Sequence, residues 1–129
     1  MISENFHFMR NTEENFISCV QGGSKKLVLF GAGYDMSQAM KKIILPNCLE
    51  VSYAVDNDFR KWYARYFGIR ICEPNRLTEE NAEQTVVLIT SRYPFRIEEQ
   101  LEGMGISHYY SSFLFLEEYI GEHQFMVTF

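Results

Sequence analysis

The segment Gly31-Ala32-Gly33-Tyr34 lies between an apolar run and a stretch with helical spacing. Gly31 can make a tight turn there, and Gly33 lets the backbone come close to a phosphate group. The helix that follows offers free N–H groups and the positive end of its dipole to an anion. This context favours a nucleotide-binding loop, in which we include Ala32 and Tyr34.

An acidic residue stands where ribose recognition requires one. Asp56 ends the second expected strand, 23 residues after Gly33, and can accept hydrogen bonds from a ribose diol. Asn57 follows it directly and is placed in the same site. Met36 replaces the third glycine of the pattern and is expected to push the helix outward, while Asp35 would repel a pyrophosphate. A ligand-free turn that keeps its glycines for backbone reasons therefore remains an alternative.

Ser91 and Arg92 follow the fourth expected strand. In the topology proposed below, the chain changes direction between the first and fourth strands, and ligands bind in the crevice at such a switch point. Arg92 can contact a phosphate or a sugar carboxylate there. The alternative is that Arg92 pairs with an acid such as Asp35 or points into water.

No catalytic pattern accompanies these residues. The sequence has no Tyr-x-x-x-Lys pair, no nucleophile elbow and no phosphate-loop lysine motif, and its three histidines lie far apart. Metal binding is therefore not expected, and no activity is assigned. The formal charge of −5 also argues against a nucleic-acid partner.

Short apolar runs alternate with amphipathic stretches along the chain. The expected strands are Leu27–Phe30, Val51–Val55, Ile69–Cys72, Thr85–Ile89 and Ile106–Tyr110. The expected helices are Thr12–Gln21, Asp35–Ile44, Phe59–Phe67, Pro94–Glu102 and Phe113–Tyr119. This alternation predicts an α/β fold, a doubly wound, Rossmann-like parallel sheet of about five strands in the order 3-2-1-4-5.

The length of 129 residues fits one domain and leaves no room for a two-domain dehydrogenase. We expect an N-terminal helical segment over residues 1–24, a core over 26–110, and a C-terminal helix and tail over 111–129. No apolar run reaches the roughly 18 residues of a membrane span. The cysteines are dispersed, so a reduced, cytoplasmic protein is expected.

Four segments in order, LVLFGAG, VSYAVDND, GIRICEPNRL and TVVLITSRYPFRIEEQLEGMGI, carry a resemblance to a known family. They resemble the small Rossmann-type domain at the N-terminus of bacterial sugar acyltransferases and nucleotide-sugar dehydratases. The resemblance implies that NAD(P) or a nucleotide-sugar binds here. It further implies a role accessory to surface-polysaccharide biosynthesis, with enzymes of that pathway as partners.

Two other functions remain open. One is a protein-interaction module with a degenerate pocket, in which Tyr34 or Met36 fills the crevice. That module would expose aromatic side chains such as those of Phe6, Phe8, Tyr109, Tyr110 and Phe125. The other is a small enzyme acting on a bound sugar nucleotide. Aromatic residues near the C-terminus also suggest that a homodimer covers an apolar patch.

Overall fold

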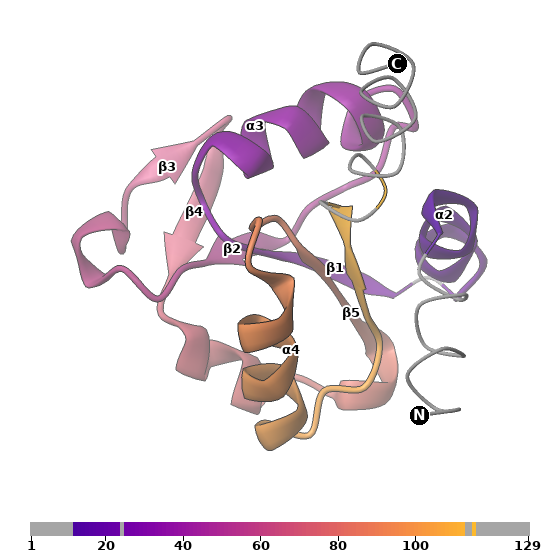
Figure 1. Ribbon diagram of the computed structural model, residues 1–129. Coiled ribbons are helices and arrows are strands. Elements are labelled where there is room, and N and C mark those ends of the chain that lie inside the picture. Colours follow the sequence, from indigo (N-terminus) through magenta and orange to yellow (C-terminus); the bar gives the residue numbers. More distant parts are fainter. Residues whose placement is uncertain (1–11, 24, 113–114, 116–129) are drawn as a thin grey trace, which may run out of the picture.

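A computed structural model describes residues 12–23, 25–112 and 115, and contains one mixed sheet of six strands. The strands are β1 (Lys26–Phe30), β2 (Tyr53–Val55), β3 (Arg65–Tyr66), β4 (Ile69–Cys72), β5 (Thr85–Ile89) and β6 (Tyr109–Ser111). Their order across the sheet is β3-β4-β2-β1-β5-β6 (Figure 1). All neighbouring strands run parallel except β3 and β4, which form an antiparallel pair.

Helical segments cover both faces of this sheet (Figure 1). The α-helices are α2 (Glu13–Gly23), α3 (Tyr34–Ala39) and α4 (Pro94–Gly103), and α3 continues as a π-helical turn, η1 (Met40–Ile44). Shorter 3₁₀ segments are η2 (Phe59–Lys61), η3 (Pro74–Glu79) and η4 (Ala82–Gln84).

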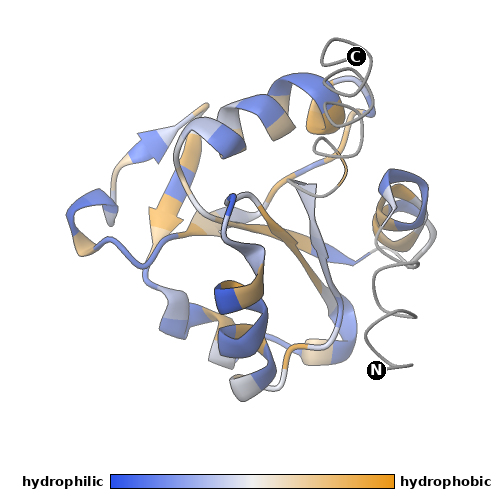
Figure 2. Cartoon of the chain, in the orientation of Figure 1, coloured by the Kyte–Doolittle hydropathy of each residue, from blue (hydrophilic) through white to orange (hydrophobic). Residues whose placement is uncertain are grey.

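Alternation along β1 creates two apolar layers. Leu27 and Leu29 pack with α2, α3 and η1 on one face, whereas Val28 and Phe30 pack with η3 and α4 on the other. Burial on both faces explains why β1 and β5 are hydrophobic after their first residues, over Leu27–Phe30 and Val86–Ile89, as the hydropathy colouring of Figure 2 shows. The α/β prediction for one small domain is therefore confirmed.

The predicted sheet needs a correction at one edge. It has six strands rather than about five, and its order differs from the predicted one because β3 lies outside β4. The helix predicted over Phe59–Phe67 is wrong. Only Phe59–Lys61 forms a 3₁₀ turn, and the chain then enters the β3–β4 hairpin.

Backbone hydrogen bonds explain why this segment is not helical. The Tyr63 N–H donates to the Ile71 carbonyl at 2.7 Å, and the Ile71 N–H donates to the Ala64 carbonyl at 2.9 Å. Phe67 and Gly68 both have positive φ, 54° and 74°, and form the two-residue turn between β3 and β4. Pairing with β4 thus replaces the i to i−4 bonds of a helix.

Other elements lie near their predicted places. The Asn15 N–H donates to the Thr12 hydroxyl at 3.1 Å, which caps the start of α2 as expected. The strands predicted at Val51–Val55 and Ile106–Tyr110 are shorter or displaced, at Tyr53–Val55 and Tyr109–Ser111. The helix Phe113–Tyr119 falls outside the described residues, apart from Phe115, as do Phe6, Phe8 and Phe125. Among described helices, none has the length and apolarity to cross a membrane.

Candidate functional site

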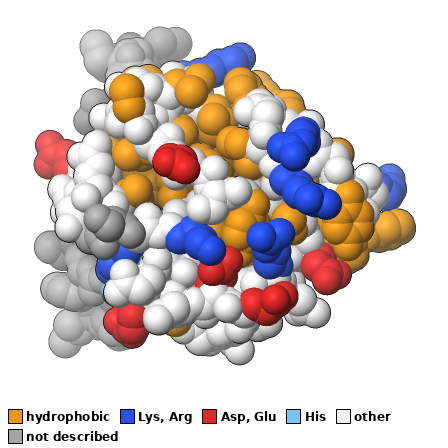
Figure 3. Space-filling model, turned by 180° about the vertical axis from the view of Figure 1, so that it is seen from behind, with side chains coloured by type: hydrophobic (Ala, Val, Ile, Leu, Met, Phe, Trp, Pro, Cys, Tyr) orange, Lys and Arg blue, Asp and Glu red, His pale blue; other side chains and the backbone are white. Residues whose placement is uncertain are grey.

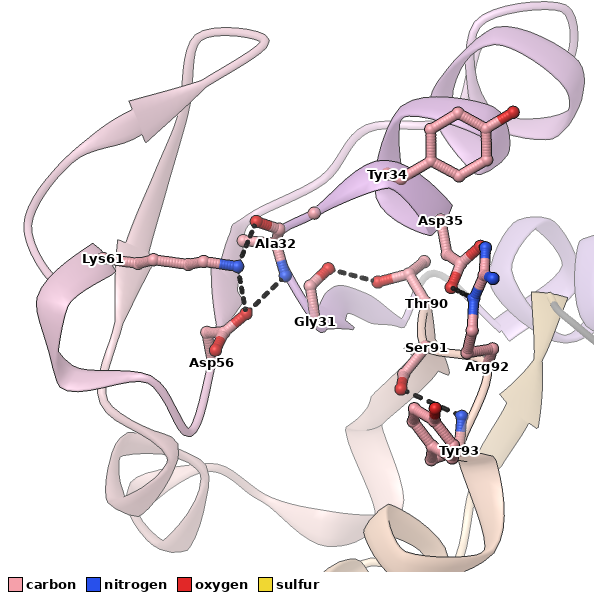
Figure 4. Close-up of a pocket in the computed structure, with 11 residues that line it drawn as sticks. Gly31, Ala32, Tyr34, Asp35, Asp56, Lys61, Thr90, Ser91, Arg92 and Tyr93 are labelled. Atoms are coloured by element: carbon pink, nitrogen blue, oxygen red, sulfur yellow. Dashed lines mark hydrogen bonds and ion pairs between the residues drawn. The ribbon is translucent and has the colours of Figure 1, made fainter.

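An open pocket of about 300 Å³ lies where the carboxyl ends of β1 and β5 meet the start of α3 (Figure 4). It is lined by Gly31, Ala32, Gly33, Tyr34, Asp35, Asp56, Lys61, Thr90, Ser91, Arg92 and Tyr93. Seven of the eight binding residues predicted from the sequence are in this lining. The fold therefore brings the loop after β1 and the loop after β5 together, as expected for adjacent parallel strands.

Gly31 is required by packing between the two strand ends. Its φ is +117°, and a Cβ atom there would lie 2.5 Å from the Thr90 carbonyl oxygen. The Gly31 N–H donates to the Val55 carbonyl at 2.8 Å, and the Thr90 hydroxyl donates to the Gly31 carbonyl at 2.6 Å. Any other residue at position 31 would force β1 and β5 apart. Thr90, which the sequence analysis did not single out, holds this turn in place.

Gly33 is in a different situation, although it belongs to the same motif. Its φ of −142° suits any residue, and a Cβ there would meet only the Lys61 Nζ atom, at 3.7 Å. No side chain caps α3 at Gly33. The fold itself thus leaves space in front of this glycine.

Asp56 connects the ends of β1 and β2. Its Oδ2 atom accepts a hydrogen bond of 2.7 Å from the Ala32 N–H, and its Oδ1 atom accepts one of 2.7 Å from the Asp58 N–H. The Lys61 ammonium lies 3.6 Å from Oδ2, and only 14% of the Asp56 side chain is exposed. The acid predicted to bind a ribose therefore already holds the glycine loop.

Lys61 enters the pocket from η2. Its Nζ atom donates to the Ala32 carbonyl at 3.0 Å, while 40% of its side chain stays exposed. Asp58 caps η2 by accepting from the Arg60 N–H at 3.0 Å, which directs the next residue, Lys61, back toward the loop. Lys61 was not predicted from the sequence as a site residue, because exposed charges on a helix are usually solvated and a helix was expected over Phe59–Phe67.

Arg92 forms an ion pair across the pocket. Its Nε and Nη2 atoms each lie 3.4 Å from a carboxylate oxygen of Asp35, at the start of α3. The hydrogen bond and the negative charge of Asp35 raise the pKa of the guanidinium. More than half of the Arg92 side chain is exposed, against 18% for Asp35. The alternative that Arg92 pairs with Asp35 is therefore the arrangement observed.

Comparison with known families places most of the chain in one of them. A family model described as C2185-like, N-terminal, matches residues 23–110. The chain belongs to this family. A search of curated proteins found nothing similar. The matched residues hold the whole sheet up to Tyr110 and every residue that lines the pocket.

Two tyrosines stand at the pocket of this C2185-like domain. Tyr34 is 66% exposed and Tyr93 is 69% exposed, whereas Met36, in α3, is fully buried in the core. Neither Tyr34 nor Met36 thus fills the crevice in the way the degenerate-pocket alternative requires. The other aromatics named for that alternative and described here, Tyr109 and Tyr110, are buried or half-buried.

Asn57 is the predicted site residue that lies outside the pocket of the C2185-like domain. Its side-chain amide exchanges two hydrogen bonds, of 3.0 and 2.9 Å, with the amide of Gln100 on α4. Ser91 lines the pocket, and its hydroxyl accepts from the Tyr93 N–H at 3.1 Å. The described part of the chain holds no group of three or more His, Cys, Asp or Glu side chains arranged for a metal ion.

Proposed function

We propose that the pocket between β1 and β5 binds a nucleotide or a nucleotide-sugar, with its phosphate between Gly33 and Arg92. The observation that carries the proposal is the pocket itself: Lys61 and Arg92 enter it from opposite sides, and a Cβ on Gly33 would meet only the Lys61 Nζ atom (Figure 4). Phosphate oxygens are the ligands that a guanidinium, an ammonium and backbone N–H groups recognise together.

The place of the pocket in the sheet supports this proposal. From β1, the chain continues to β2 on one side, and β5 pairs with β1 on the other side. Crevices at such a switch point, beyond the carboxyl ends of the strands, are where doubly wound sheets bind ligands. We therefore interpret the parallel part of the sheet as Rossmann-like, extended by the β3–β4 hairpin.

The remaining lining groups fit the other parts of a nucleotide. Tyr34 and Tyr93 offer exposed rings on which a base can stack. A volume of about 300 Å³ is small for a whole dinucleotide, because ligand pockets span roughly 300–1,000 Å³. A nucleotide-sugar or NAD(P) would extend past the tyrosines into solvent.

A bound phosphate would replace Asp35 as the partner of Arg92. The two distances of 3.4 Å between Arg92 and Asp35 are long for a charge-assisted hydrogen bond, which is normally about 2.7–2.9 Å. A phosphate oxygen at the shorter distance would give Arg92 a better partner. In this proposal the domain supplies nucleotide binding to enzymes of bacterial sugar-nucleotide or surface-polysaccharide biosynthesis, as the resemblance of its motifs implies.

Calorimetric titration of the purified chain tests the proposal. The panel is NAD(H), NADP(H) and UDP-, CDP- and GDP-linked sugars, with Gly33→Val and Arg92→Gln as variants and Arg96→Gln, on exposed α4 surface, as the matched control. We expect at least one ligand to bind the wild type and the control equally, and both pocket variants to lose it. Absence of binding by the whole panel to a cooperatively folded sample would refute the proposal.

A second candidate function is supported by one observation. Asp35 and Asp56, the two acids of the pocket, are already paired with groups of the same chain. A domain that acts only as a protein-interaction module would have such a pocket, in which the acidic side chains pair with groups of the same chain and need no ligand. The same titration separates the two candidates, because the module binds no member of the panel.

A further inference from the structure

Residues 59–70 present aromatic and basic side chains at the edge of the sheet, and we call them the hairpin surface. Phe59 is 71% exposed, Tyr63 is 67% exposed and Phe67 is 42% exposed. We propose that the hairpin surface docks an acidic, aromatic-containing segment of another protein. This proposal does not require the nucleotide proposed for the pocket, whose lining shares Lys61 with the hairpin surface.

The charge of the hairpin surface is opposite to that of the rest of the chain. Residues 59–70 carry four Arg or Lys side chains and no Asp or Glu, in a chain whose net charge is −5. Arg60 pairs with Asp58 and Lys61 with Asp56, so the positive charge without a carboxylate partner among the described residues is that of Arg65 and Arg70. Figure 3, where the hairpin end lies at the right, shows Lys and Arg side chains beside hydrophobic ones there. Large exposed apolar side chains beside charges of a single sign are typical of a binding surface.

Two of these cations face outward. Arg65 donates to the Gly68 carbonyl at 3.1 Å, and the Arg70 guanidinium lies 5.9 Å from the centre of the Tyr63 ring. Both side chains belong to exposed residues, and neither has a carboxylate partner within the described residues. They can therefore bind acidic groups without first breaking an ion pair.

The backbone at Tyr63 and Phe67 indicates that these two exposed rings do not serve the fold. Tyr63 has a φ of 72° and Phe67 a φ of 54°, which are costly for bulky residues. The turn at Phe67-Gly68 has the geometry that Asn-Gly satisfies best. Among the described residues, the Phe67 ring contacts the ring of Tyr66, with 4.9 Å between the ring centres. An aromatic ring that is strained and exposed fits a role in binding.

The kind of occupant follows from shape and charge. Strand addition is disfavoured, because β3 has only two residues and one of them is Arg65. A symmetric second copy would bring the same cations against themselves. A long polyanion would also meet the acidic remainder of the molecule. A short protein segment avoids these penalties, and Trp, Tyr and Arg are the residues that dominate protein–protein binding.

Trp62 reports on this surface, because it is the only tryptophan of the chain and its ring contacts that of Phe59 at 6.5 Å. The probe is a short synthetic peptide that alternates Glu with Phe and Leu and lacks Trp. Its titration should change the Trp62 emission, and added salt should weaken the binding. The Arg65→Glu/Arg70→Glu variant should bind about tenfold more weakly or worse.

The Lys42→Glu/Arg96→Glu variant is the matched control, since it makes the same change of net charge at exposed positions elsewhere. It should bind the peptide within about twofold of the wild type. Equal weakening in both variants would refute the proposal, as would equal binding of a peptide with Lys in place of Glu. Emission changes only with oligodeoxythymidine or with phosphatidylglycerol vesicles would assign the surface to nucleic acid or membrane instead. No response to any probe would also overturn it.

Discussion

The pocket and the hairpin surface adjoin at η2, but they differ in whether their charged side chains have partners in the chain. In the pocket, Lys61 contacts Asp56 and Arg92 contacts Asp35, so each charge has a partner in the chain. On the hairpin surface, Arg65 and Arg70 face solvent with only backbone or ring contacts. A ligand of the pocket must replace the carboxylates that now pair with Lys61 and Arg92. This requirement favours selectivity among ligands. A partner of the hairpin surface meets cations that are already available.

The largest expected effect separates the two glycines of the pocket. Gly31→Ala places a Cβ 2.5 Å from the Thr90 carbonyl at a φ of +117°, so we expect a loss of about 3 kcal/mol or more in unfolding free energy. Gly33→Ala should cost no more than about 1 kcal/mol, because its φ is ordinary and its surroundings are open. Urea denaturation of both variants measures this difference. Equal losses would contradict the distinct roles given to the two residues.

The next effect concerns the connection between β1 and β2. Asp56→Ala removes the acceptor of the Ala32 and Asp58 N–H groups, so we expect a loss of about 2–3 kcal/mol in unfolding free energy. Glu99→Ala, on exposed α4 surface, is the control and should change stability by less than about 0.5 kcal/mol. A stable Asp56→Ala variant would mean that the carboxylate is free to serve a ligand.

A smaller effect, of opposite sign, is expected on the hairpin surface. Phe67→Asn places a residue that tolerates positive φ before Gly68, so we expect stability to rise by up to about 1 kcal/mol. The same change should weaken binding of the acidic peptide and leave nucleotide binding unchanged. Thermal unfolding and the two titrations test this. A destabilised variant that binds the peptide normally would show that Phe67 serves the fold.

The smallest effect lies away from both regions, at the amino ends of β1 and β2. Burial would raise the pKa of Glu80, but hydrogen bonds from Tyr53 at 2.7 Å and Lys26 at 2.9 Å hold it below its ordinary value. This stabilisation is complete above the ordinary glutamate pKa of about 4.3 and is lost as pH falls through the lowered pKa. Glu80→Gln should therefore flatten the stability profile in that acidic range. A profile unchanged by the substitution would contradict the assignment.

The pocket could be predicted from the sequence, since its residues follow apolar runs that become neighbouring parallel strands. Gly31, Gly33 and Arg92 converge because the carboxyl ends of β1 and β5 meet at one edge of the sheet. The role of Asp56 could not be predicted in the same way. The spacing in the sequence places Asp56 near the glycine loop. Only the folded chain shows that the Ala32 N–H donates to its Oδ2 atom at 2.7 Å.

The hairpin could not be predicted from local pattern. Phe59, Trp62, Tyr63 and Tyr66 follow the i, i+3, i+4, i+7 spacing of a helix. Long-range hydrogen bonds to Ile71 in β4 and positive φ at Tyr63 and Phe67 override that pattern. The Phe67-Gly68 pair ahead of an apolar strand was the available signal for a tight turn.

Amide chemical shifts of a nitrogen-15-labelled sample would locate a bound nucleotide in the pocket. The titrant is the nucleotide that binds best in calorimetry or, if none binds, UDP and ADP. We expect shift changes centred on Gly33, Tyr34, Ser91 and Arg92, with Arg65 and Phe67 unchanged. No shifts, or shifts centred on the hairpin surface, would contradict a nucleotide site in the pocket.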